Sequence, residues 1–203
     1  MRKKSHISLA KFLINNMKVQ DLNEHKKSFY IGSVLPDLKP SFLTRRHTID
    51  ETFEVLIKEI KKITVNYDIN KGINRYYARH LGVVTHYLSD YCTYPHNSIF
   101  DGTIKEHISY EKELKCTFKE YIVREDIQRE RKQCQMLHLD DVLGFIILTH
   151  KEYLKALKDV HQDIHFIIDI CYKVVDAILR FFEIAMYQLQ ITMGPEQMEL
   201  EQA

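Results

Sequence analysis

The chain has 203 residues, enough for one domain with a buried core, and its 29 Lys and Arg residues nearly balance 28 Asp and Glu residues. A formal charge of +1 argues against the strongly basic surface typical of nucleic-acid-binding domains, and the sequence contains no acidic tail. Only six Gly and four Pro interrupt the chain, and 45% of its residues are hydrophobic and arranged in periodic runs, which predicts an all-α fold.

Apolar periodicity divides the chain into helices that we expect to form one compact multi-helix domain over residues 1–190. Thr48-Ile-Asp-Glu51 has the form of a capping box, and Pro36 ends the helix before it. The expected helices span about 5–18, 21–35, 48–63, 73–93, the region around 104–118, 139–158 and 161–190. The tail at 191–203 contains a Gly-Pro breaker and no long periodic pattern, so we expect it to be disordered.

The sequence also carries signals about cellular location. No run approaches the roughly 18 apolar residues of a transmembrane helix. The amino terminus reaches Lys11 after only a few apolar residues, so it lacks a secretory signal. The widely spaced cysteines are expected to be buried free thiols, and they are Cys92, Cys116, Cys134 and Cys171. We therefore expect a cytoplasmic protein without a transmembrane segment; the sequence does not define its oligomeric state.

Two histidine–carboxylate pairs dominate the middle of the chain. His86 and Asp90 are four residues apart, and so are His107 and Glu111. On a helix this spacing places both side chains of a pair on one face. The second pair lies in a stripe whose other members are apolar, where an ionised carboxylate needs a partner. A single such pair is usually a surface hydrogen bond, whereas two pairs together favour a divalent metal site.

Other polar residues could join these pairs. His96 follows Pro95, so a loop can turn it back toward His86 and Asp90. Asp37 lies in a stiff loop between two prolines, where it could otherwise cap a turn. His47 stands immediately before the expected helix at 48–63, and His6 heads the first apolar stripe, a position typical of capping histidines.

Two positions near His86 admit two interpretations each. Gly82 lies one turn before His86 and leaves room for either a neighbouring helix or a substrate. Arg79 could contact a phosphate or could be exposed to solvent, which is commoner for arginine.

The motifs H-Y-L-S-D, P-H and H-x-x-x-E, preceded by an isolated Asp and His, resemble the zinc-dependent phospholipase C family over roughly residues 5–115. Fungal single-strand-specific zinc nucleases share that superfamily. The resemblance implies an α-helical protein with a multi-zinc site at the base of a cleft. The ordered set that carries it is His6, Asp37, His47, His86, Asp90, His96, His107 and Glu111.

The resemblance also implies a role for each of these residues. One zinc would be held by Asp37, His47, His86 and Asp90, and a second by His96, His107 and Glu111. A third would lie between Asp90 and His6, joined in secreted relatives by the free amino-terminal residue. The chain departs from the family pattern in having no Trp and no signal sequence, so we expect two zinc ions and leave the third site open.

The expected function is hydrolysis of a phosphate diester by a metal-activated water, with Asp37 as the catalytic residue that orients or deprotonates the water. Two zinc ions against three carboxylates would leave the centre about one charge positive, which attracts a phosphate diester. The substrate could be a phospholipid or another phosphate ester, and nucleic acid is disfavoured but stays open. The alternative is a catalytically inactive, metal-stabilised helical binding protein. The absence of His-Asp and Glu-x-x-His motifs disfavours two other classes of helical metalloprotein.

Overall fold

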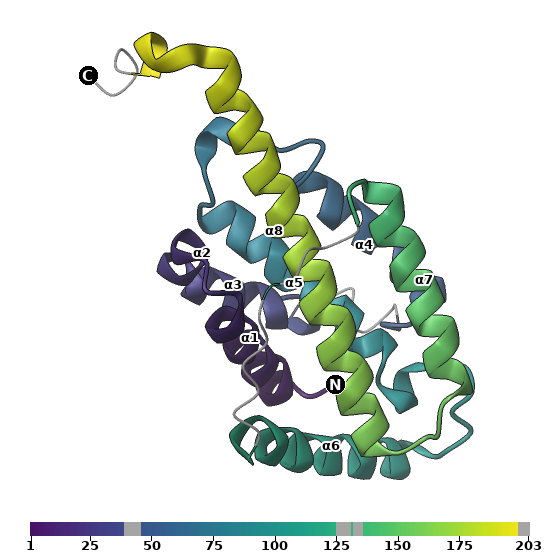
Figure 1. Cartoon of the computed structure of the whole chain (residues 1–203). Coiled ribbons are helices and arrows are strands. Elements are labelled where there is room, and N and C mark those ends of the chain that lie inside the picture. The colour runs from purple at the N-terminus through teal and green to yellow at the C-terminus, as the bar shows by residue number, and fades with distance from the viewer. Residues whose placement is uncertain (39–45, 125–130, 132–135, 199–203) are drawn as a thin grey trace.

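The computed structural model describes residues 1–38, 46–124, 131 and 136–198, and it confirms the all-α prediction (Figure 1). Every regular element in this part of the chain is a helix. In chain order these are α1 (Lys3–Met17), α2 (Gln20–Glu24), α3 (Lys26–Val34), η1 (Pro36–Leu38), α4 (Ile49–Lys62), η3 (Ile69–Lys71), α5 (Arg75–Tyr91), η4 (Tyr94–His96), α6 (Ile104–Arg124), α7 (Leu139–Lys155) and α8 (Val160–Met198).

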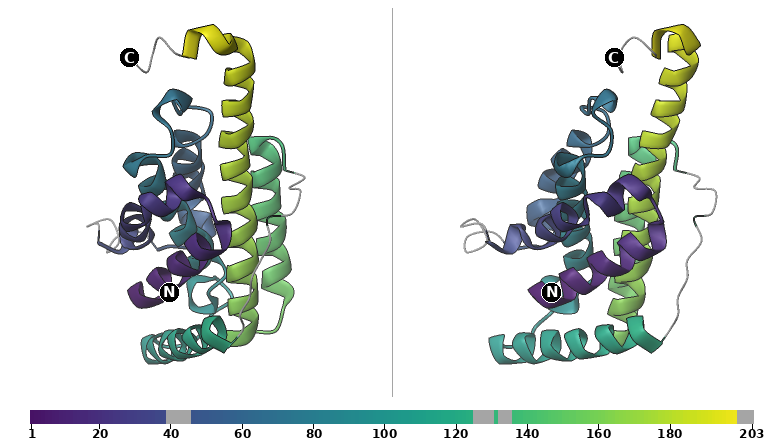
Figure 2. Two further views of the ribbon diagram at one scale, coloured as in Figure 1. Left: turned by 60° about the vertical axis from the view of Figure 1, so that its left-hand side comes forward. Right: turned by 90° about the vertical axis from the view of Figure 1, so that its left-hand side faces the viewer.

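Helix α5 is the centre of the fold. The Asn74 side chain caps its start by accepting hydrogen bonds from two backbone N–H groups. From Leu81 to Cys92 every residue is buried, since α1, α3, α4 and α8 all pack against this helix. Helix α6 lies across one end of the assembly, close to the amino terminus and to the last turns of α5 (Figure 2). This arrangement brings α1, α5 and α6 together at one end.

Helices α3 and α5 cross at a contact between two glycines, Gly32 and Gly82. A Cβ atom on Gly32 would lie 2.0 Å from the Arg79 carbonyl oxygen, and one on Gly82 would lie 2.2 Å from the Phe29 carbonyl oxygen. Gly82 therefore admits a neighbouring helix, which is one of the two interpretations that the sequence allowed. Arg79 is exposed, the commoner of its two interpretations, and it is not among the residues that line the cleft described below.

The chain differs from the expected element boundaries in two places. The helix expected at 21–35 is interrupted at His25, which separates α2 from α3. Helix α8 continues to Met198, so the tail expected to be disordered from residue 191 is helical through that residue. Its extension follows a run of good helix formers at 186–190, because each residue added to an existing helix gains a hydrogen bond. Residues 199–203 lie outside the described part.

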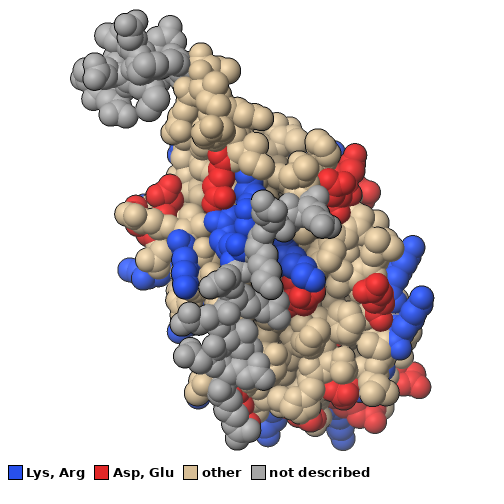
Figure 3. Space-filling view, in the orientation of Figure 1, with Lys and Arg blue, Asp and Glu red and all other residues tan. Residues whose placement is uncertain are grey.

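The sequence also led to expectations about the surface charge, membrane-spanning segments and the cysteines. Basic and acidic side chains are both scattered over the face in Figure 3, in keeping with the balanced composition. None of the helices in the described part of the chain has a segment that is long and apolar enough to cross a bilayer. Cys92 and Cys171 are buried free thiols as expected, Cys116 is exposed, and Cys134 lies outside the described residues.

Candidate metal centre

The residues predicted as metal ligands come from six separate segments and gather at one end of α5. Helix α5 supplies His86 and Asp90 from its last turns. Two short 3-10 helices supply one residue each, Asp37 from η1 and His96 from η4. The remaining four are His47 just before the Thr48 cap of α4, His107 and Glu111 on α6, and His6 on α1.

Four of these side chains form a first cluster, in which each offers one ligand atom and all these atoms lie within 4.8 Å of one another. Its members are Asp37, His47, His86 and Asp90. Nε2 of His86 lies 2.9 Å from Nδ1 of His47 and 3.2 Å from Oδ2 of Asp90. Oδ1 of Asp37 is 3.6 Å from Nε2 of His86. One ion could contact all four side chains.

The hydrogen bond on the far side of His86 decides which ring nitrogen faces this cluster. Nδ1 of His86 donates to the Ser33 carbonyl oxygen at 2.9 Å. In the neutral ring Nε2 then carries a lone pair, and this lone pair points at the carboxylate oxygens of Asp90 and Asp37. A metal ion at this point could be coordinated by one atom from each of the four side chains. The first cluster therefore fits a metal ion, and the Ser33 carbonyl fixes the ligand tautomer.

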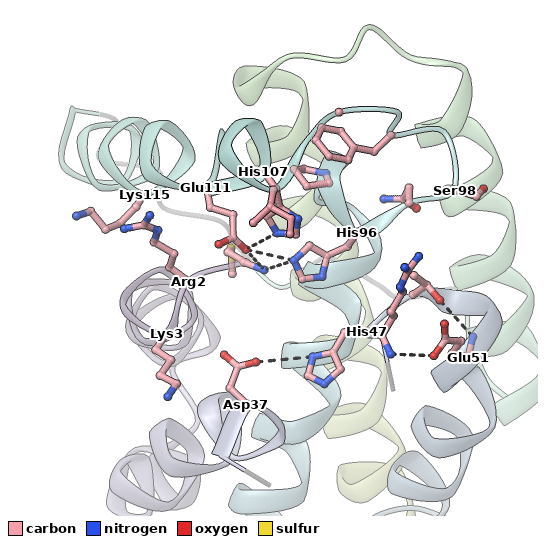
Figure 4. Close-up of a pocket in the computed structure, with 18 of the residues that line it drawn as sticks. Arg2, Lys3, Asp37, His47, Glu51, His96, Ser98, His107, Glu111 and Lys115 are labelled. Carbon is pink, nitrogen blue, oxygen red and sulfur yellow. Dashed lines mark hydrogen bonds and ion pairs between the residues drawn. The ribbon is translucent and has the colours of Figure 1, made fainter. Parts of the chain in front are cut away.

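A second cluster consists of His96, His107 and Glu111, whose ligand atoms also lie within 4.8 Å of one another. Oε1 of Glu111 is 3.2 Å from Nε2 of His96 and 3.5 Å from Nε2 of His107. Figure 4 shows these side chains pointing toward one another from α6 and η4. The cluster is more open than the first, since the His107 side chain is 34% exposed whereas those of His86 and Asp90 are 0% exposed.

The amino group of Met1 lies between the two clusters, beside the third position that the family resemblance raised and the sequence analysis left open. Its nitrogen is 2.6 Å from Oδ1 of Asp90, 2.9 Å from Nε2 of His96 and 3.1 Å from Oε1 of Glu111. His6 joins this group, because its Nε2 lies 3.1 Å from the Met1 carbonyl oxygen and 3.4 Å from Oδ1 of Asp90. A backbone amine and a buried histidine thus adjoin the carboxylate that the first cluster uses.

The pKa directions favour the protonation states that metal ligands need. Burial would raise the pKa of Asp90, but the Met1 amine and the nearby histidines hold it well below its usual range. Hydrogen bonds from His107 and His96 likewise lower the pKa of Glu111 against the effect of burial. Burial lowers the pKa of His6 and of His96, so both imidazoles are neutral at neutral pH. Asp90 and Glu111 are thus held ionised and His6 and His96 neutral, which are the states in which these groups bind zinc.

The pKa values of Asp37 and of the Met1 amine are raised, whereas those of the four groups above are lowered. Burial raises the pKa of Asp37, and the positive charge of the facing histidines offsets this only in part. Burial would lower the pKa of the Met1 amine, but Asp90 and Glu111 raise it above its ordinary value. The amine is therefore a cation that partly neutralises the two carboxylates.

A cleft of about 1110 Å³ opens over the two clusters. Met1, Asp37, His47, His96, His107 and Glu111 line it, whereas His6, His86 and Asp90 lie beneath its floor. A ligand entering from solvent would therefore reach Asp37, His47 and the second cluster directly.

A buried carboxylate outside the clusters holds the second cluster in place. Oδ2 of Asp163 accepts hydrogen bonds from the Tyr94 backbone N–H and the Tyr110 hydroxyl, both at 2.9 Å. Tyr94 begins η4, which carries His96, and Tyr110 precedes Glu111. The Tyr153 hydroxyl donates to the other oxygen at 2.7 Å. Sequence reasoning missed Asp163 because its partners come from three distant segments.

The sequence matches the family model of zinc dependent phospholipase C over residues 5–160. The all-helical fold and the histidine and carboxylate clusters that could hold a metal agree with this family, and the match extends over most of the chain. The chain therefore belongs to the zinc dependent phospholipase C family, as the sequence motifs predicted. No curated protein and no solved structure gives a significant match.

Proposed function

We propose that the chain is a zinc-dependent hydrolase of phosphate diesters, phospholipids among them. The observation that carries the proposal is the convergence of acceptor atoms beneath the cleft, above all the His86 Nε2 lone pair directed at two carboxylates. A metal ion would satisfy these acceptors together, and the ligand types are those of zinc. Membership of the family supports the same metal and the same class of reaction.

In this proposal the two clusters each hold one zinc ion. The first uses Asp37, His47, His86 and Asp90, and the second uses His96, His107 and Glu111. A third position would lie among Oδ1 of Asp90, Nε2 of His6 and the amine and carbonyl oxygen of Met1. Oδ1 of Asp90 is 2.6 Å from the amine and 3.4 Å from Nε2 of His6. Nε2 of His6 is 3.1 Å from the Met1 carbonyl oxygen. The amine must lose its proton to serve as a ligand, so that position depends on pH.

Bound zinc would supply Lewis-acid stabilisation of the charge that develops on phosphorus oxygens and would make a water acidic near neutral pH. The protein's own residues arrange the rest. Asp37 lines the cleft from η1, and its oxygen lies beside the first cluster at 3.6 Å from Nε2 of His86. From there it can orient the attacking water and take up its proton. His86, fixed by the Ser33 carbonyl, keeps the first cluster rigid during the reaction.

The test compares hydrolysis of a soluble phosphodiester with zinc content. In Asp37→Asn one oxygen ligand remains but the charge and the base are lost, so activity should fall by about a hundredfold while zinc content falls less. Glu111→Ala should lower zinc content and stability together, because it removes a ligand shared with His96 and His107. Asp140→Asn, the same change at an exposed site in the first turn of α7, is the matched control and should alter neither property.

Two results would defeat parts of this proposal. Wild-type protein that is fully metallated yet inactive on every phosphate ester tried would favour the inactive binding protein instead. If Asp37→Asn keeps wild-type activity, Asp37 is not the partner of the attacking water.

His80 is unsuitable as a control, even though it lies on the opposite side of α5 from the site, because it forms a close ion pair with Glu59.

A further inference from the structure

One wall of the cleft is basic. Arg2 and Lys3 come from the start of α1, and Lys115 lies one turn beyond Glu111 on α6. Figure 4 shows these three side chains on one side of the site, with His47, Glu51 and Ser98 on the other. We call the three residues the basic wall. It flanks the second cluster, the more exposed of the two.

The charge of the basic wall is not balanced locally. Among the ion pairs of the described residues, none joins Arg2, Lys3 or Lys115 to a carboxylate. The Arg2 guanidinium is anchored by donating to the Ile108 carbonyl oxygen at 3.1 Å, which holds it in the wall and leaves other N–H groups available. The chain as a whole has almost equal numbers of acids and bases, so this grouping is local.

The rest of the cleft does not cancel this charge. Apart from the predicted ligands, its acidic lining residues are Asp50 and Glu51, and both lie on the α4 side. Glu51 is already engaged there, because it accepts a hydrogen bond from the Arg46 backbone N–H at 2.8 Å. Two further cations, Lys4 and Arg46, also line the cleft. Outside the metal centre the cleft is therefore strongly positive.

The positive charge in the cleft, taken together with that of the metal centre, is larger than the charge needed to bind one phosphodiester. A centre with two zinc ions and three carboxylates is about one charge positive, and more so with the Met1 amine protonated, so it already matches the single negative charge of the reacting phosphate. The basic wall is then available for a second anionic group. A cationic head group would instead need carboxylates or a cage of aromatic faces, and Phe100 is the only aromatic residue among the non-ligand residues that line the cleft in the described part of the chain.

We propose that the preferred substrate carries a second negatively charged group, a phosphate monoester, beside the phosphodiester that is hydrolysed, and that Lys3 and Lys115 recognise it. This inference rests on the proposed function. Both a phosphorylated lipid head group and a nucleotide with a terminal phosphate have this chemistry. The two sources differ in the remainder of the molecule, so matched substrates distinguish them.

The experiment uses two pairs of soluble substrates with the zinc-loaded protein at low salt. One pair is a thymidine dinucleotide with and without a 5′-phosphate, and the other is a short-chain phosphatidylinositol with and without a phosphate on the inositol ring. Only cleavage of the diester is followed, by chromatography of the products. In whichever pair is hydrolysed, kcat/KM should be roughly tenfold higher for the phosphorylated member, as expected for two solvent-facing charge pairs.

Variants assign this selectivity to the wall. The double variant Lys3→Gln with Lys115→Gln should lose the roughly tenfold preference while still hydrolysing the unphosphorylated member. A double variant at Lys112 and Lys119, which are exposed on the same helix and do not line the cleft, should keep it. Added salt should weaken the preference in the wild type.

The outcomes separate this inference from the proposed function. Hydrolysis of a diester without preference, or a preference that survives in the Lys3 and Lys115 variant, overturns the basic wall and leaves the hydrolase standing. If no diester is hydrolysed, the proposed function fails. Calorimetric binding of the phosphorylated and unphosphorylated dinucleotides then tests by itself whether the basic wall recognises a phosphate monoester. Equal affinities would overturn it, and tighter binding of the phosphorylated one that the double variant abolishes would uphold it.

Discussion

Replacing Gly82 with alanine should destabilise the protein, because this residue sets how closely α3 and α5 approach. The added Cβ would lie 2.2 Å from the Phe29 carbonyl oxygen and 2.8 Å from the Ser33 amide nitrogen, whereas ordinary contacts begin at 3.4 Å. The obstacles are backbone atoms, which cannot rotate away. Helix α3 would have to retreat by about 1.2 Å, the difference between the first distance and an ordinary contact.

The size of the effect follows from two opposing terms. Overpacking a close-packed interior costs about 1–3 kcal/mol, and a backbone clash belongs at the upper end of that range. Alanine regains about 1 kcal/mol over glycine in a helix. We therefore expect Gly82→Ala to lower the free energy of unfolding by about 2 kcal/mol. The site should suffer too, because the Ser33 carbonyl that orients His86 lies on the helix that moves.

Denaturant unfolding of the metal-free protein measures this change, as a lower midpoint at an unchanged slope. Gly144→Ala is the matched control, since no atom lies within 4 Å of its Cβ position in α7. It should stabilise the protein by up to about 1 kcal/mol through helix propensity alone. A Gly82→Ala protein whose midpoint equals or exceeds that of the wild type would refute the reasoning, because α3 and α5 would then separate at no cost.

Two further predictions concern charge. Chelation of the metal should lower the midpoint of thermal unfolding by several degrees, because facing acceptors such as His86 Nε2 and Asp90 Oδ2 lose the cation between them; an unchanged midpoint in calorimetry would contradict this. Burial raises the pKa of Asp163 to about 6 from the ordinary 3.8. The folded state therefore keeps a proton that the unfolded chain releases, so the stability this proton gives is present below about pH 4 and lost as pH rises through about 6. Asp163→Asn cannot titrate, and its stability relative to the wild type should rise by up to about 3 kcal/mol between those limits, checked by urea midpoints at several pH values; a constant difference would show that Asp163 does not titrate there.

The local part of the site could be predicted from sequence. Spacing by four residues on a helix determines that His86 and Asp90 share a face, and likewise His107 and Glu111, whatever the rest of the fold does. The same apolar periodicity that defines the last two expected helices carries Ile146, Ile167 and Val174, which are fully buried. These predictions succeeded because they depend on helical geometry alone.

The long-range part could not be derived in this way. Asp37 faces His86 because α3 packs on α5 through the two glycines, and His47 does so because α4 also packs on α5; it was the family motifs that associated both with the site. His150 has no carboxylate at helical spacing to mark it in the sequence, yet it is buried and bonded to Asn97 at 2.9 Å. Nothing in the spacing of either residue indicates that contact.

The position of the Met1 amine was left open for a related reason. A terminal amine leaves no pattern in a sequence, and its role depends on where α1 begins relative to α5. In the structure it lies against Asp90 and Glu111 as a buried cation. Only the packing of three helices at one end of the molecule brings these groups together.

The difference in burial between the two clusters gives them different parts in the proposed reaction. His86 and Asp90 are fully buried in α5, whose last turns are also core, so the metal-binding strength of the first cluster is tied to the stability of the fold. The second cluster is partly exposed and is held from behind by Asp163 through Tyr94 and Tyr110. It also adjoins the basic wall, because Lys115 follows Glu111 by one helical turn. In this division the buried cluster fixes the reacting centre, while the exposed cluster and the basic wall meet the substrate, so changes of specificity can arise at the wall without disturbing the core.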